Sequence, residues 1–105
     1  MEKVTEEIEE MAEVLKAISH PIRLCIVCGL LEHSCNVSKI KECMSLPQST
    51  VSKHVGILRT KGIIKGYRNG SEIIYKLVND NVKKVVTTLM KNNEALRPKE
   101  RTEIK

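Results

Sequence analysis

Four cysteines carry the most reactive side chains in this sequence. Cys25 and Cys28 are three positions apart, and Cys35 and Cys43 follow them. As thiolates, such residues bind soft metals and metalloids, react with oxidants and form disulfides. Cysteine is also among the residue types most often buried, so packing in the core is the competing interpretation. The choice depends on the compartment and on the elements that hold each thiol.

The start of the chain and its hydropathy indicate the compartment. The first segment is acidic through Glu2, Glu6, Glu7, Glu9, Glu10 and Glu13. This chemistry is wrong for a secretory signal or an Arg-rich transit peptide. No apolar run approaches the ~20 residues of a membrane span. We therefore expect a cytoplasmic protein with no membrane partner, whose cysteines are mostly reduced thiols.

The pair Cys25 and Cys28 falls within a predicted helix. Ser19, His20 and Pro21 open this helix, with Ser19 able to cap it, and the helix continues to about Glu32. Its middle, residues 24–31, is apolar almost all round, which predicts a core helix. Zinc knuckles place Cys-x-x-Cys on a tight turn, and thioredoxin-like enzymes place it between a strand and a helix. The helical setting fits neither.

Amphipathic helices are predicted at both ends of the domain. The first has an apolar seam with a heptad period, formed by Val4, Ile8, Met11, Leu15 and Ile18. The last runs from about Asp80 to Leu96, with one apolar side formed by Val82, Val85, Val86 and Leu89. Each face packs either within one subunit or against a second copy. We expect one domain over residues 1–96 and a charged, disordered tail over 97–105.

The middle of the chain predicts a helix-turn-helix followed by a β-hairpin. A short helix with Val37, Ile40 and Met44 precedes a second that begins at Pro47 or Gln48. The second helix has a buried stripe, formed by Val51, Val55 and Leu58, opposite a polar face formed by Ser49, Ser52, Lys53, Gly56 and Thr60. Two β-rich runs then flank Asn69-Gly70, where both turn positions are expected to have positive φ. The predicted fold class is mainly α with a small β-hairpin wing (α+β): a winged helix-turn-helix of four helices, two strands and a fifth helix.

Positive charge is concentrated in the same part of the chain. The formal net charge is +5, and residues 36–76 alone carry eight lysines and arginines against two glutamates, a net +6. A basic surface fits a polyanionic partner, although a solvated surface is the alternative. The positive charge falls on the predicted helix-turn-helix and hairpin, and this location favours the polyanionic partner.

Three linked segments resemble the ArsR/SmtB family of bacterial and archaeal repressors. They are residues 15–24, residues 48–59 and the hairpin around Arg68-Asn69-Gly70 and Ile74-Tyr75-Lys76-Leu77. The resemblance covers roughly residues 14–78. It implies a homodimer held by the first and last helices. In each subunit, the second helix of the helix-turn-helix would enter the major groove, and the two subunits would occupy successive major grooves of a double-stranded operator. An inducer then lowers the affinity for DNA.

The residues expected at DNA follow from the polar helix and the wing. Phosphate contacts position such a protein and base contacts specify the sequence. The predicted set is Gln48, Ser49, Thr50, Ser52, Lys53, His54, Arg59, Tyr67, Arg68 and Asn69. Within it, Lys53 and Arg59 are expected mainly at phosphates, Gln48 at an adenine, and Arg68 at the minor groove or its phosphates. For His54 the alternative is a satisfied core residue, and for the others it is plain solvation.

The resemblance also bears on the signal. The family's Cys-x-Cys metal site aligns with Asn36 and Ser38, and its second metal site aligns with a region that offers Asn79, Asn81 and Asn92. Neither metal site is expected here, nor is any other metal or cofactor. The sulfide- and persulfide-responsive branch of the family matches Cys28, but its partner cysteine in the last helix is missing.

The leading sensing hypothesis is therefore thiol chemistry at Cys28, paired with Cys25 or Cys35, with Arg23 or His33 as the activating positive charge. A soft metalloid such as arsenite is the second hypothesis, and no cysteine function is the third.

Two other classes of function compete with a DNA-binding regulator. An enzyme is not expected, because no nucleophile with a base, phosphate loop or histidine-rich cluster occurs in the sequence. A winged helix can also serve protein assembly without binding DNA. Such a module is expected to expose more apolar surface on the helix that would otherwise read DNA.

Overall fold

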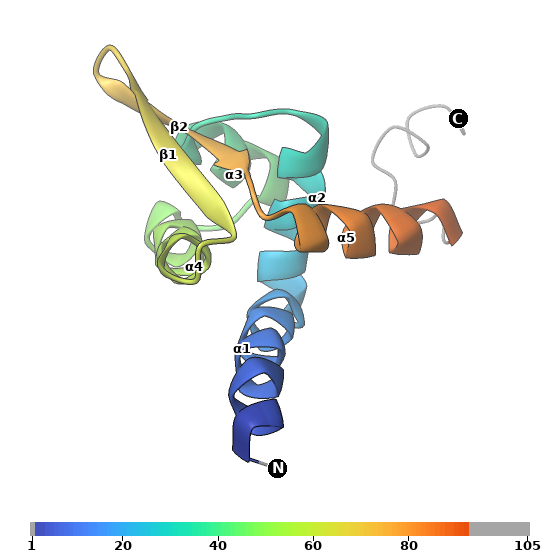
Figure 1. Ribbon diagram of the computed structural model, residues 1–105. Helices are drawn as coiled ribbons and strands as arrows, with labels where there is room; N and C mark the ends of the chain where they lie inside the picture. The colour runs from blue at the N-terminus through green and yellow to red at the C-terminus, as the bar shows by residue number, and fades with distance from the viewer. Residues whose placement is uncertain (1, 93–105) are drawn as a thin grey trace.

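Four helices, a β-hairpin and a fifth helix follow one another along the chain, as predicted (Figure 1). The computed structural model describes residues 2–92. Its elements are α1 (Glu2–Ile18), α2 (Pro21–Glu32), α3 (Val37–Met44), α4 (Gln48–Thr60), β1 (Ile64–Asn69), β2 (Glu72–Leu77) and α5 (Asp80–Asn92). The predicted continuation of α5 to Leu96 and the predicted tail over 97–105 lie outside the described residues.

Helix α2 runs through the middle of the core, in agreement with its apolar sequence. Its residues Ile26, Val27, Cys28 and Leu30 are buried. The largest fully buried side chains around them come from α4, the turn into β1, β1 itself and α5, and include Leu58, Ile63, Ile64, Val51, Val82 and Val86. The aliphatic core thus joins the helix-turn-helix, the base of the hairpin and the last helix.

The cap of α2 differs from the prediction. His20, not Ser19, is the N-cap, because its Nδ1 accepts a hydrogen bond from the Ile22 backbone N–H at 3.1 Å. The Ser19 hydroxyl instead donates to the Lys16 carbonyl at 3.0 Å, at the end of α1. Ser19 therefore belongs to the end of one helix and His20 to the start of the next.

Local backbone geometry fixes both ends of α4. Before it, Ser45 ends α3 in the left-handed conformation with φ 56°, which makes the helix-turn-helix turn tight. After it, Gly62 has φ +74°. The Gly62 N–H donates to the Arg59 carbonyl, and the Ile63 N–H donates to the Leu58 carbonyl. This pair of bonds is a Schellman motif, in which glycine is the favoured residue. The motif turns the chain from α4 directly into β1.

The hairpin pairs β1 and β2 antiparallel, from Ile64 opposite Leu77 to Asn69 opposite Glu72. Its turn is therefore centred on Gly70 and Ser71, one residue later than predicted. Gly70 has φ +69°, whereas Asn69 belongs to the strand and is not a positive-φ residue. A positive φ at the first central position alone is the pattern of a type II′ turn.

The base of the wing is tied to the start of α3. Cys35 and Tyr75 form an isolated antiparallel bridge with two backbone hydrogen bonds, at 2.8 and 3.3 Å. Asn36 caps α3 through a 2.8 Å bond from the Lys39 N–H, and its amide donates to Glu72 Oε1 at 3.0 Å. These contacts set the position of the wing relative to the helix-turn-helix.

Helices α1 and α5 extend away from the hairpin and from α4 (Figure 1). The part of the α1 seam that the structure describes is buried only at Ile18, whereas Ile8, Met11 and Leu15 are exposed by 51–58%. On α5, Val82 and Val86 pack into the core, but Val85 and Leu89 are exposed by 39% and 46%. Packing within one subunit therefore does not cover these apolar side chains.

No helix among the described residues is both long enough and apolar enough to span a membrane alone. Residues 5–18 and 21–32 pass that test only together, as a pair bent by 89°.

Candidate nucleic-acid interface

The outer face of α4 is polar and exposed. Gln48, Ser49, Ser52 and Lys53 are exposed, and Thr50 is half-buried. The opposite face carries Val51, Val55 and Leu58 into the core, as the sequence predicted. No described side chain caps the start of α4, since Pro47 offers no hydrogen-bonding side chain there. The Thr50 and Val51 N–H groups donate to the Pro47 carbonyl at 3.1 Å, which leaves the Gln48 and Ser49 N–H groups at the start of α4 for an acceptor such as a phosphate oxygen.

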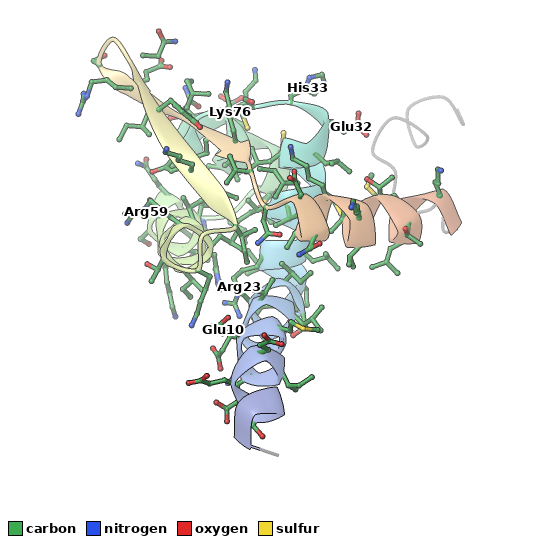
Figure 2. All side chains as sticks on the ribbon, in the orientation of Figure 1. Glu10, Arg23, Glu32, His33, Arg59 and Lys76 are labelled. Atoms are coloured by element: carbon green, nitrogen blue, oxygen red, sulfur yellow. The ribbon has the colours of Figure 1, made fainter. Side chains whose placement is uncertain are left out.

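Cations line the same helix from its middle to the residue just after its end. Lys53, Arg59 and Lys61, with Gly56, Ile57 and Thr60, surround an open depression of about 340 Å³. Arg59 projects outward from α4 (Figure 2). Lys61 is held by an ion pair with Glu13 of α1 at 3.0 Å, and this bond lowers the pKa of the Glu13 carboxyl. The depression is basic and shallow, which suits a phosphate chain better than an enclosed small molecule.

The wing adds a second cationic group. Two ammonium groups lie close to the Tyr67 ring, with Lys65 Nζ at 5.5 Å and Lys76 Nζ at 5.1 Å from its centroid. Arg68 and Asn69, next to the turn, are exposed. The hairpin that carries these cations extends from the side of the molecule where α4 also lies (Figure 1). Lys61, Lys65 and Lys76 were absent from the predicted DNA-binding set, although their places beside the polar helix and in the wing were signals that could have included them.

His54 is the predicted DNA residue that the structure places elsewhere. It is 7% exposed, and its Nδ1 lies 3.1 Å from the Arg23 guanidinium Nη1. Its ring packs against that of His20, with centroids 4.7 Å apart. These contacts favour the alternative interpretation, a satisfied core histidine. Every third or fourth residue of a helix shares a face, so His54 lies with Val51 and Leu58 and not with Ser52.

The four cysteines occupy different environments. Cys25 and Cys43 are exposed, Cys35 is half-buried and Cys28 is buried. Burial raises the pKa of the Cys28 thiol, and nearby Cys25 adds to this effect. Burial, followed by the effect of Cys43, also raises the pKa of Cys35. Neither Arg23 nor His33, the two cations hypothesised to activate Cys28, is among the groups that shift its pKa. The Arg23 guanidinium lies against His54 and the Ala17 carbonyl instead.

Two of the asparagines that the resemblance aligns with the family's metal sites cap helices here. Asn36 caps α3, and Asn79 caps α5 by accepting a hydrogen bond from the Val82 N–H at 3.0 Å. The side chain of Asn92 lies outside the described part of the chain. Within that part, no three histidine, cysteine, aspartate or glutamate side chains are grouped so as to hold a metal ion.

Comparison with known proteins places these features in a family. The family model described as bacterial regulatory protein, arsR family, matches residues 20–65. The transcriptional repressor PagR of Bacillus anthracis is 42% identical over 83 residues, which cover 78% of this chain and 83% of PagR. The chain belongs to the arsR family. The biofilm growth-associated repressor of Xylella fastidiosa, another relative, is 36% identical over 76% of this chain and 70% of its own length.

Solved structures agree with this ArsR-family assignment. The crystal structure of PagR matches with a TM-score of 0.75 at 41% identity, over 81% of this chain and 98% of that one. That of the transcriptional repressor BigR from Xylella fastidiosa matches with a TM-score of 0.77 at 33% identity, over 88% and 94%. The predicted winged helix-turn-helix is thereby confirmed, and this ArsR-family chain is a DNA-binding transcriptional regulator.

Proposed function

We propose that this ArsR-family protein is a homodimeric repressor, acting in the cytoplasm, that binds a double-stranded operator through α4 and the wing. The observation that carries the proposal is the exposed polar face of α4, flanked by cations of α4 and its C-terminal end and by cations of the hairpin. The exposed large apolar side chains among the described residues lie on α1 and α5, on the hairpin and at Val78, and none lies on α4. This distribution disfavours a module that assembles with proteins through α4.

Roles within the interface follow from side-chain chemistry. Gln48, Ser49, Thr50 and Ser52 are short or amide side chains suited to base edges, and Gln48 can pair with both polar groups of an adenine. Lys53, Arg59 and Arg68 are suited to phosphates, which position the protein without reading sequence. Tyr67 and Asn69 join Arg68 at the wing, where the minor groove is the nearest base surface.

A second copy of this chain accounts for the exposed apolar faces of α1 and α5. Ile8, Met11 and Leu15 form one stripe, and Val85 and Leu89 form another. Two-fold pairing through these helices would give each dimer two copies of α4. Half-sites one helical turn apart would then each receive one α4 helix.

The DNA-binding proposal is tested with a random-sequence duplex and with a duplex selected from a random pool. Fluorescence anisotropy is expected to show binding to both, tighter for the selected duplex, with affinity that falls steeply as salt rises. A protein that binds neither duplex at low ionic strength would contradict the proposal and leave the assembly function as the better account.

For the signal, we propose an oxidative thiol reaction of the pair Cys25 and Cys28, entered from the exposed Cys25. Residues three apart on a helix have Cβ atoms about 5–6 Å apart, whereas a disulfide needs about 3.5–4.5 Å. A bond between these sulfurs therefore distorts α2, the core helix that packs against α1, α4 and α5. Diamide can drive the step by accepting the two thiol protons and two electrons as the S–S bond forms. Arsenite, bridging both thiolates, is the second candidate.

The thiol proposal predicts that diamide lowers operator affinity of the wild type by about 5–150-fold, the usual range of coupling between sites. Cys25→Ser and Cys28→Ser are each expected to abolish the response, while Cys43→Ser, also at an exposed cysteine, preserves it. Anisotropy measures the affinity, and mass spectrometry identifies the linked cysteines. A Cys28→Ser variant that responds to diamide, polysulfide and arsenite like the wild type would rule out sensing at this residue.

A further inference from the structure

Behind the proposed DNA-binding face lies a cluster of three cationic or titratable side chains: His20, Arg23 and His54. The Arg23 Nε donates to the Ala17 carbonyl at 2.6 Å, and its Nη1 lies 3.1 Å from His54 Nδ1. The His20 and His54 rings are 4.7 Å apart at an angle of 37°. Figure 2 places Arg23 where the end of α1 meets the body of the molecule.

The hydrogen bonds fix the state of His54. Arginine has only donors, so His54 Nδ1 must accept from Arg23, and the proton of the neutral ring resides on Nε2. His20 Nδ1 likewise accepts, from the Ile22 N–H. The geometry therefore requires an uncharged His54 in contact with a charged guanidinium.

Arg23 links three helices. Ala17 belongs to the last turn of α1, whose carbonyls lack partners within that helix, and His54 belongs to α4. One guanidinium, carried by α2, thus joins the end of α1 to the centre of α4. Because Ser52 and Lys53 precede His54 on α4, the contact also sets how far the polar face stands out from the body.

We propose that Arg23 and His54 are positioning residues for DNA binding, and that protonation of His54 breaks their bond and releases DNA as the pH falls. The proposal rests on the DNA-binding function proposed above. Protonated His54 has a donor at Nδ1, which meets the Arg23 donor, so α4 must move to separate the two charges.

The surroundings of His54 all oppose its charged form. Burial lowers the pKa of His54, and the neighbouring His20, Arg23 and Lys53 lower it further. These groups come from the N-cap of α2, from α2 and from α4 itself. No carboxylate of the described residues is among the groups that shift this pKa, so none compensates the added charge. An α4 helix held in a groove has less freedom to relieve the repulsion than one in the free protein. Proton binding and DNA binding therefore compete.

The direction in which DNA affinity changes on acidification distinguishes protonation of His54 from a general increase in positive charge. A proton added anywhere else on the protein raises its positive charge and strengthens attraction to phosphate. Competition at His54 acts in the opposite direction. The unfolded chain also takes up the His54 proton at a higher pH than the folded chain. The free energy of unfolding is therefore expected to fall as the pH drops below the unfolded-state pKa toward the lower folded-state value.

The test uses a duplex that the wild type selects from a random pool at about pH 7.5. Fluorescence anisotropy then measures the affinity of the protein for this duplex from about pH 7.5 down to about pH 5.5. Wild-type affinity is expected to fall severalfold over this range, since each proposed dimer carries two His54 rings whose protons bind the free protein more tightly than the complex. His54→Asn keeps an acceptor near the Nδ1 position and cannot titrate. It should therefore bind at about pH 7.5 and lose the acid-dependent decrease. His33→Asn, at an exposed histidine outside the cluster, should retain the decrease.

Nitrogen NMR of wild-type histidines adds a reading that needs no variant. At about pH 7.5 His54 is expected as the tautomer protonated on Nε2. An affinity that is unchanged or rises on acidification, or a His54 protonated on Nδ1, overturns the inference while the proposed function stands. Failure of the wild type to select any duplex overturns both.

Discussion

Replacing both Met11 and Leu15 with glutamate is expected to convert the proposed dimer into monomers and to lower operator affinity by about 10²–10⁴-fold. The two side chains are exposed by 58% and 51%, so the fold of one subunit does not depend on them. In a dimer they would be buried against a partner, where an unpaired carboxylate is costly. Without the partner, one α4 helix would bind a single half-site, and the gain from linking two half-sites would be lost.

Analytical ultracentrifugation measures the oligomeric state of this double variant, and anisotropy measures its affinity. Lys16→Glu is the matched control, because it changes the charge of α1 by the same two units at an exposed position away from the apolar stripe. The control should remain dimeric. A double variant that is folded, by its thermal unfolding, yet still dimeric would show that α1 does not form the interface.

Lys53→Ala and Arg68→Ala should each flatten the salt dependence of operator binding. Both cations are exposed, one on α4 and one on the wing. Each phosphate contact contributes about 0.9 to the slope of log affinity against log salt, so a dimer that loses two equivalent contacts loses about 1.8. The loss should be similar for every DNA sequence, because phosphates carry no sequence information.

The salt dependence is measured by anisotropy for each variant over the same range of salt. Lys91→Ala, at an exposed cation on α5, serves as the control with an unchanged slope. Gln48→Ala should behave differently. It should reduce the difference in affinity between the selected and the random duplex, while the slope of log affinity against log salt stays unchanged. Unchanged slopes for both Lys53→Ala and Arg68→Ala would remove these residues from the interface.

Periodic patterns predicted the elements of this fold well, whereas single-residue geometry was harder to predict. The apolar stripe of Val51, Val55 and Leu58 defined α4 because a helix buries every third or fourth residue. The hairpin was predicted from Asn69 and Gly70, but its turn is one residue later. Turn type depends on the register of the two strands, which the base of the wing fixes through distant backbone contacts.

In the candidate site, too, some residues could be predicted from spacing along a helix, whereas others depend on tertiary contacts. Gln48, Ser49, Ser52 and Lys53 could be assigned to one exposed face, since their spacing alone determines which side of α4 they share. The burial of His54 depends on Arg23, which lies 31 positions earlier in the chain. Nothing in local sequence indicates such a contact.

The sequence by itself determined the order of helices and strands, the polar face of α4 and the basic character of the region around it. These features depend on residue type and on spacing along a regular element. The tertiary structure alone decided that His20 caps α2, that Arg23 joins Ala17 to His54 and that Cys28 is buried while Cys25 is exposed. Such outcomes depend on which segments meet in space, because burial and hydrogen-bond partners are properties of the packed core and not of any one segment.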